Sequence, residues 1–174
     1  VDDLQELSRV ESRAYQLDIH PVDFSSIVQT VAKRLAPQAE SKRISLNLEL
    51  PPDLAQILAD EDRTIQILTN LTGNALQYTP EGGRVTISAR QVSEEVQISI
   101  RDTGPGIPAE HLPHIFDRFY RVDKSRSRQA GGGSGIGLTI SRALVEAHGG
   151  GLSAASAGEG QGSTFTIRLP AAGG

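Results

Sequence analysis

Four stretches of the chain place apolar residues every three or four positions, which is the spacing of an amphipathic helix. Asp23 is a candidate N-cap for the second of these helices, and Asp60 or Asp62 for the third. The helices are expected at residues 2–15, from Asp23 through Ile27, Val28, Val31 and Leu35, from Asp60 or Asp62 to about Thr79, and over 135–148.

Other stretches alternate apolar and polar residues, which predicts strands with one buried face. Such alternation occurs over 44–50, 85–89 and 96–100, and a last hairpin ends in Phe165, Ile167 and Leu169. Helices segregated from mostly antiparallel strands favour an α/β (α+β) fold. We expect a two-layer sandwich in which a mixed, mostly antiparallel sheet packs on about three helices.

Composition narrows the class of protein without identifying it. The 174 residues suit a single domain that can bury a sizeable core, and a hydrophobic content of 37% fits a globular protein. With no cysteine, disulfides and cysteine-ligated zinc are excluded. A net charge of −4 offers no bulk attraction to nucleic acid. No apolar run is long enough to span a membrane, so we expect no direct membrane contact.

The third expected helix has a polar stripe that is a candidate metal site. On a helical wheel Asn70 and Asn74 lie one turn apart on the same side, opposite Leu68, Leu71 and Ala75. Amide oxygens there can join the ligand shell of magnesium, which prefers oxygen. An ordinary solvated polar face is an equally good interpretation of this helix alone.

Two glycine-rich segments follow strands and are candidate ligand-binding turns. Asp102 ends a strand before Gly104 and Gly106, and its carboxylate can accept a hydrogen bond from an exocyclic amine such as that of adenine. A tight turn is the structural alternative. Near the C-terminus Gly158–Gly162 precedes Thr164, whose hydroxyl could share adenine contacts with Asp102; by itself the segment is a glycine-rich hairpin.

A third glycine run, over 131–137, passes directly into the last expected helix. Free backbone N–H groups and the helix dipole make such a junction suitable for phosphates. It follows neither the Walker pattern nor the Rossmann pattern, and a flexible linker is the less favoured alternative. Residues 103–134, between the Asp102 turn and this helix, form a long irregular stretch typical of a functional loop or lid.

Taken in order, these segments resemble the ATP-binding catalytic domain of sensor histidine kinases, in the superfamily that includes gyrase, mismatch-repair and heat-shock chaperone ATPases. The resemblance covers residues 22–170 and rests on five motifs. They are an asparagine box from Asn70 to Pro80, a first glycine box from Asp102 to Ile107, an aromatic box from Phe116 to Arg121, a second glycine box from Gly133 to Leu138, and a third from Gly160 to Phe165.

The resemblance implies ATP and Mg²⁺ as cofactors and gives each motif a role. Asn74, with Asn70, would hold magnesium; Asp102 would take the adenine amino group; Arg118 and Arg121 would meet the terminal phosphate. Asn70, Arg118 and Arg121 are the catalytic candidates, and a mobile ATP lid would span about 108–134. The implied nucleotide contacts are Asn70, Asn74, Gln77, Tyr78, Asp102, Gly104, Gly106, Ile107, Tyr120, Gly133, Ser134, Gly135, Ile136, Gly137, Leu138 and Thr164.

The chain departs from the family at one position and lacks one motif. Gln77 stands where the asparagine box often has lysine, so it brings no positive charge to a phosphate. None of the four histidines has the sequence context of a phosphoacceptor. Residues 1–20 are interpreted as a remnant of the dimerisation hairpin's second helix, 21–170 as the catalytic domain and 171–174 as a tail.

The expected function is transfer of the ATP γ-phosphate to a histidine on a hairpin domain outside this sequence. The expected partners are ATP or ADP, that histidine-containing domain and, indirectly, a response regulator; the location is cytoplasmic, with a parent protein anchored in the inner membrane. Alternatives are a non-catalytic nucleotide sensor and an anti-sigma-like serine kinase or ATPase. Against an ATPase, Asn70 is an amide where such enzymes usually carry a glutamate base.

Overall fold

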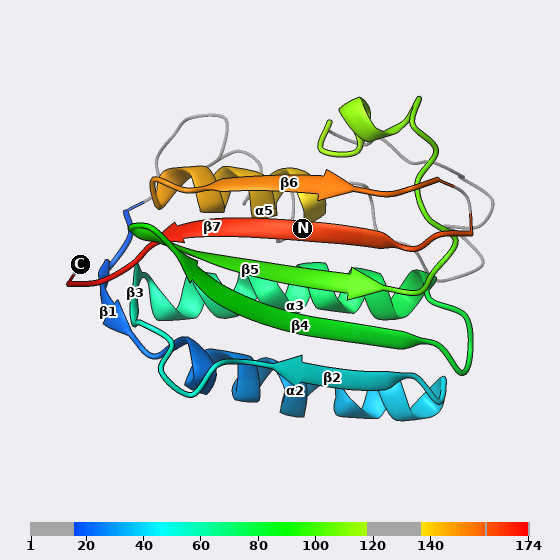
Figure 1. The fold of residues 1–174 in the computed structure, drawn as a ribbon, viewed down its shortest axis with the longest axis horizontal. Coiled ribbons are helices and arrows are strands. Elements are labelled where there is room, and N and C mark those ends of the chain that lie inside the picture. The colour runs from blue at the N-terminus through cyan, green and yellow to red at the C-terminus, as the bar shows by residue number, and fades with distance from the viewer. Residues whose placement is uncertain (1–15, 118–136, 159, 174) are drawn as a thin grey trace.

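The computed structural model describes residues 16–117, 137–158 and 160–173 (Figure 1). The expected helix at 2–15 lies outside them. The elements run β1 His20–Val22, α2 Phe24–Ser41, β2 Ser45–Glu49, β3 Ile57–Ala59, α3 Glu61–Tyr78, β4 Arg84–Val92, β5 Glu95–Asp102, a short 3₁₀ helix η1 Leu112–His114, α5 Gly137–Ala147, β6 Gly151–Ala155 and β7 Ser163–Pro170.

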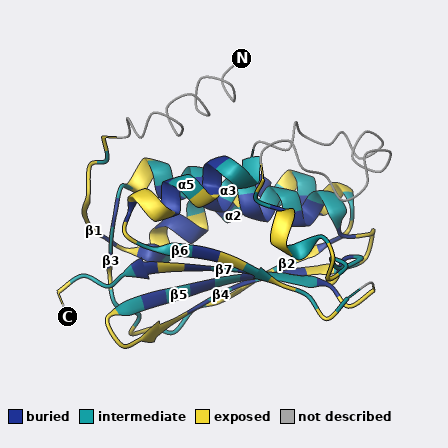
Figure 2. Ribbon diagram, turned by 90° about the horizontal axis from the view of Figure 1, so that it is seen from above, coloured by how far each residue is buried: buried dark blue, intermediate teal, exposed yellow. Residues whose placement is uncertain are grey.

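The main sheet has five strands in the order β2-β4-β5-β7-β6, and only the β2–β4 pair is parallel. Helices α2, α3 and α5 all cover one face of this sheet, while the other face is open (Figure 2). The expectation of a two-layer α/β sandwich with a mixed, mostly antiparallel sheet on three helices is therefore confirmed.

The core lies between the helices and the sheet. Val96, Ile98 and Ile100 of β5 have no exposed surface, because β5 is the central strand and their side chains all point toward the helices. On α2, the predicted stripe from Ile27 to Leu35 is buried as expected. Each fully buried side chain of this kind stabilises the fold by about 1.5–3 kcal/mol.

Both helices that were expected to begin at an aspartate do so. The Asp23 Oδ1 accepts the Ser25 N–H at 3.0 Å and caps α2, and the Asp60 Oδ1 accepts the Arg63 N–H at 3.1 Å and caps α3. Asp60, rather than Asp62, is therefore the residue that starts the third expected helix. After the C-terminal end of α5, Gly149 adopts a φ of 81°, which lets the chain turn out of the helix.

Two short strands were not expected from the sequence. β1 and β3 pair antiparallel, from His20 with Ala59 to Val22 with Ile57, and form a separate two-stranded sheet in which β3 contacts β7. With three residues each, they are too short for alternation to be recognised. Ala171 continues this edge by bridging Ile57, so the first residue of the expected tail contacts the domain.

None of the helices in the described part of the chain combines the length and the apolar character that a membrane span requires.

Candidate functional site

Asp102 is the buried carboxylate at the end of the central strand β5. Only 9% of its surface is exposed, and it points toward the helices. Its Oδ1 accepts the Gly104 N–H at 2.8 Å and its Oδ2 accepts the Ser163 hydroxyl at 2.7 Å. A carboxylate has about four acceptor positions, so two remain for a ligand that offers an N–H group.

Glycines bring two turns close to this carboxylate. The turn after β5 contains Gly104 and Gly106, and the turn before β7 contains Gly160 and Gly162. The Gly162 N–H donates to the Gly104 carbonyl at 3.1 Å. Gly106 and Gly162 have positive φ values of 78° and 71°, and a Cβ at Gly162 would collide with the Asp102 carbonyl oxygen. Only glycine permits this approach at these two positions.

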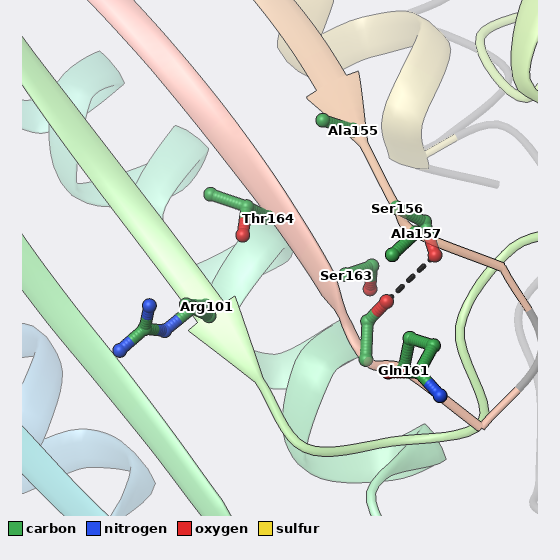
Figure 3. A pocket seen from close by; sticks show the side chains of 8 residues that line it. Arg101, Ala155, Ser156, Ala157, Gln161, Ser163 and Thr164 are labelled. Carbon is green, nitrogen blue, oxygen red and sulfur yellow. Dashed lines mark hydrogen bonds between the residues drawn. The ribbon is translucent and has the colours of Figure 1, made fainter.

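The hydroxyl that reaches Asp102 belongs to Ser163. Thr164, which was expected to share adenine contacts with Asp102, is the next residue along β7. In the β5–β7 register Asp102 pairs with Ser163, whereas Arg101 pairs with Thr164. Because successive side chains alternate between the two faces of a sheet, Thr164 lies with Arg101 on the open face. Figure 3 shows Arg101 and Thr164 in the hollow on that face, with Ser163 one residue earlier on β7.

The C-terminal end of α3 lies next to the same turn. A Cβ at Gly104 would be 3.4 Å from the Tyr78 carbonyl oxygen, so helix and turn are in close contact. Lys42, just after α2, donates from Nζ to the Leu76 and Gln77 carbonyls, both at 2.8 Å. Burial lowers the pKa of Lys42. A cation on the last carbonyls of a helix stabilises that end and so helps to hold Tyr78 beside Gly104.

Asn70 and Asn74 lie on α3 along the side that faces α5. The Asn70 Nδ2 is 3.5 Å from the Ser141 Oγ of α5, and the two helices run antiparallel, since Asp60 at the start of α3 contacts His148 at the end of α5. Asn74 is therefore one turn closer than Asn70 to the N-terminus of α5, where Gly137 and Leu138 lie. Both asparagines are half-buried.

The amide oxygens on the side of α3 that faces α5 suit a hard cation whose other ligands come from water and a nucleotide. No group of three or more His, Asp or Glu side chains that could hold a metal ion occurs among residues 16–117, 137–158 and 160–173. Amide oxygens of Asn70 and Asn74 alone would leave most positions of an octahedral shell open, which suits magnesium bound together with phosphate oxygens and water.

The described beginning of the expected lid packs on the core. Ile115 is 4% exposed, and the Phe116 ring meets Phe165 edge-on with centroids 6.1 Å apart. The Thr139 hydroxyl of α5 donates to the Phe116 carbonyl at 2.8 Å. Ile115 and Phe116 thus fix the end of this described stretch on the core.

His148 is the buried histidine, and its bonds define a structural role. The backbone N–H of Asp60 donates to Nε2 at 3.1 Å, and Nδ1 lies 2.7 Å from the Leu144 carbonyl. Since a backbone N–H can only donate, Nε2 accepts and Nδ1 carries the proton, so the ring is neutral. These bonds give His148 a structural role, and the ring is not a cation at the end of α5.

Asp60 completes this contact between α3, α5 and the incoming chain. Besides capping α3, its Oδ2 accepts the Asp18 N–H at 3.0 Å. Burial raises the pKa of Asp60, but the hydrogen bonds from the Asp18 and Arg63 backbone N–H groups and the positive charge of Arg63 lower it by more. The net pKa is therefore below the ordinary value. We call Asp18, Asp60 and His148 the α3–α5 clasp.

Several expected site residues lie outside the described part of the chain. They are Arg118, Tyr120, Arg121, Gly133, Ser134, Gly135 and Ile136. Sequence reasoning missed Ser163 and Lys42. Strand register would have shown that Ser163, and not its neighbour, shares the face of Asp102; no sequence signal links Lys42 to the end of α3.

A two-layer domain with a strand-end carboxylate among glycine turns and an asparagine-bearing helix has the features of a nucleotide-binding ATPase domain. The chain belongs to the histidine kinase-, DNA gyrase B-, and HSP90-like ATPase family, whose model matches residues 59–173.

Similar proteins include the sensor histidine kinase WalK of Bacillus subtilis, 40% identical over 172 residues. The histidine-protein kinase BaeS of Escherichia coli is 38% identical over 170 residues. Both alignments cover 98% of this chain but only 28% and 36% of the relatives, so the chain spans about a third of the curated relatives that it matches.

The fold is also that of solved histidine kinase structures. Full-length ShkA in complex with AMPPNP aligns with a TM-score of 0.86 and 33% identity, over 98% of this chain and 35% of that one. The mycobacterial sensor histidine kinase MprB aligns with a TM-score of 0.75 and 29% identity, over 88% of this chain and 97% of that one.

Proposed function

We propose that this domain binds ATP with magnesium and donates the γ-phosphate to a histidine on a helical hairpin domain of a two-component sensor kinase. The observation that carries the proposal is the Asp102 carboxylate, which is buried at the end of β5 between two glycine turns and has acceptor positions left for an adenine amino group. The named kinases among the relatives support the reaction class.

The arrangement of α3 and α5 gives the bound nucleotide a direction. Asp102 and Gly104 lie at the C-terminal end of α3, where Tyr78 would flank the base. Asn74 and Asn70 follow one and two turns back along α3, facing α5. The base would therefore lie at Asp102, and the phosphates would extend toward the asparagines and the N-terminus of α5, where helix N–H groups favour anions.

The domain's own residues would position the nucleotide and its magnesium ion and would not activate a water molecule. Asn70 and Asn74 would hold magnesium through amide oxygens, and the chemistry that this ion supplies is neutralisation of charge on the phosphate oxygens. An amide at residue 70 cannot take a proton from water as a carboxylate does, which favours transfer to a protein histidine over hydrolysis. Arg118, Arg121 and Gly135 remain proposed phosphate contacts, and Gln77 a neutral one.

The proposed reaction is tested by phosphotransfer. The domain is mixed with γ-³²P-labelled ATP, magnesium and a purified histidine hairpin from a relative such as WalK, and label on the hairpin is followed with time. We expect acid-labile label on the hairpin with the wild-type domain and none with Asp102→Asn. If the domain binds ATP but transfers label to none of several hairpins, it would instead be a nucleotide-sensing module. Rapid phosphate release without a hairpin would indicate an ATPase.

A further inference from the structure

Ser156 is a residue outside the motifs whose hydroxyl joins both glycine turns of the site. It follows β6 directly and is half-buried. Its Oγ accepts the Ile107 N–H at 3.0 Å from the turn after β5. The same oxygen accepts the Gly158 N–H at 3.2 Å. The Ser156 hydroxyl in turn donates to the Gly162 carbonyl at 2.7 Å in the turn before β7, as the dashed line in Figure 3 shows.

These bonds use the full capacity of one hydroxyl group, which has one proton to donate and two lone pairs. Ser156 thereby links two points of the turn before β7, Gly158 and Gly162, to each other. Through Ile107 it also links this second turn to the first turn, which follows β5. Two backbone bonds complete the contact, from the Gly160 N–H to the Pro105 carbonyl and from the Gly162 N–H to the Gly104 carbonyl.

The contact between the turns determines where the partners of Asp102 lie. Gly104, which donates to Oδ1, belongs to the first turn, and Ser163, which donates to Oδ2, follows the second. Gly106 has room only for hydrogen at its Cα, since a Cβ there would collide with the Gly158 carbonyl and lie 3.0 Å from the Ser156 Oγ. The spacing of the two turns is thus set by direct contact at Ser156.

We propose that Ser156 is a positioning residue for the adenine end of the site. It does not contact the nucleotide; it holds the turns at the separation at which Asp102 keeps both protein donors and two free acceptor positions. The inference rests on the proposed ATP function. Removing the hydroxyl would leave the Ile107 N–H and the Gly162 carbonyl without this partner, and the turns would separate or admit water.

The test compares Ser156→Ala with Ser156→Thr, which keeps a hydroxyl. The control is Ser153→Ala, which removes an exposed hydroxyl from β6, the strand before Ser156. ADP and adenosine affinities are measured by calorimetry at a temperature at which every variant is folded. We expect Ser156→Ala to weaken both ligands by about tenfold. Ser156→Thr should recover most of this loss, and Ser153→Ala should bind like the wild type.

Equal weakening of ADP and adenosine is the signature of an effect on the base rather than on the phosphates. Hydrogen exchange of the Ile107 amide, followed by NMR in the free protein, should accelerate in Ser156→Ala but not in Ser153→Ala. If Ser156→Ala does not fold, Ser156→Cys, with a weaker hydrogen-bonding group, is measured in its place and should show a smaller loss.

A lower melting temperature with unchanged ADP and adenosine affinities would overturn the proposal and leave Ser156 a purely structural residue. If wild-type protein binds no adenine nucleotide, the proposed function fails first. The two failures are therefore distinguished by the wild-type measurement.

Discussion

Each end of the α3–α5 pair holds a carboxylate that accepts hydrogen bonds from the protein, but the two carboxylates have different roles. At the clasp, Asp60 caps α3 and takes the Asp18 N–H, while the neutral His148 ring is bonded on both sides. At the other end, Asp102 caps no helix and is approached by glycine turns. A carboxylate that caps a helix has a structural role in that helix. A buried carboxylate at a strand end among glycine turns has no such role and is a candidate ligand-binding group.

The largest expected effect is at the ligand-binding end. Asp102→Asn keeps an oxygen for one protein donor but loses the charge and half of the acceptor positions. We expect adenine nucleotide affinity to fall by about a hundredfold, since hydrogen bonds to a charged group contribute about 1.5–3 kcal/mol. Calorimetry with ADP and magnesium measures this change. Asp60→Asn is the matched control, and similar affinity losses in both variants would remove the distinction between the two ends.

The proposed magnesium site at the ligand-binding end is tested by Asn74→Ala. With magnesium present, ATP affinity should fall by about tenfold, because an amide ligand of the ion is lost. Without magnesium, the variant and the wild type should bind ADP alike, because the base contacts are unchanged. Titrations with and without EDTA separate these effects. A magnesium dependence equal to that of the wild type would contradict the assignment of Asn74.

The neighbouring hydroxyls at the start of β7 provide a test at single-residue resolution. Ser163→Ala removes a donor to Asp102 and should weaken ADP binding by about fivefold. Thr164→Ala changes the open face of the sheet and should leave ADP binding unchanged. The two variants are compared in one calorimetric series. The opposite ranking would show that the register of β5 and β7 is not as described.

At the clasp the expected effect is on stability. Asp60→Ala and Asp23→Ala each remove a helix cap, which costs about 1 kcal/mol in free energy of unfolding. Asp60→Ala should cost more, because the bond to Asp18 is lost as well. Urea unfolding followed by circular dichroism gives both values. Nucleotide affinity of the folded variants should not change, and equal losses would show that the Asp18 contact contributes nothing.

The smallest expected effect is a pH dependence at Asp60. Because its pKa is lower in the folded protein than the ordinary 3.8, its ionised form stabilises the fold. This contribution is fully present above about pH 5 and is lost as the pH falls through the folded-state pKa. The difference in unfolding free energy between the wild type and Asp60→Asn should therefore shrink below about pH 4. A difference that stays constant down to pH 2.5 would contradict the lowered pKa.

The sequence predicted what depends on local pattern and not what depends on register or distant contact. The starts of α2 and α3 could be predicted from Asp23 and Asp60, because a cap acts within three residues. The β4–β5 hairpin could be predicted from the alternation of apolar and polar residues on both sides of Ser93 and Glu94. The choice between Ser163 and Thr164 requires the pairing of β7 with β5, and the Lys42 contact joins residues 34 and 35 positions apart. Motif resemblance supplied the site, but it could not supply these geometries.

The parallel pairing of β2 with β4 has a consequence for the order of folding. The β4–β5 hairpin closes through a turn at Ser93 and Glu94, so its strands can pair within microseconds. β2 reaches β4 only after the chain has passed through β3 and α3, and this larger loop must be closed before the pair contributes any stability. We therefore expect substitutions in the β4–β5 hairpin to slow folding, whereas those at Leu46 or Leu48 of β2 should mainly accelerate unfolding.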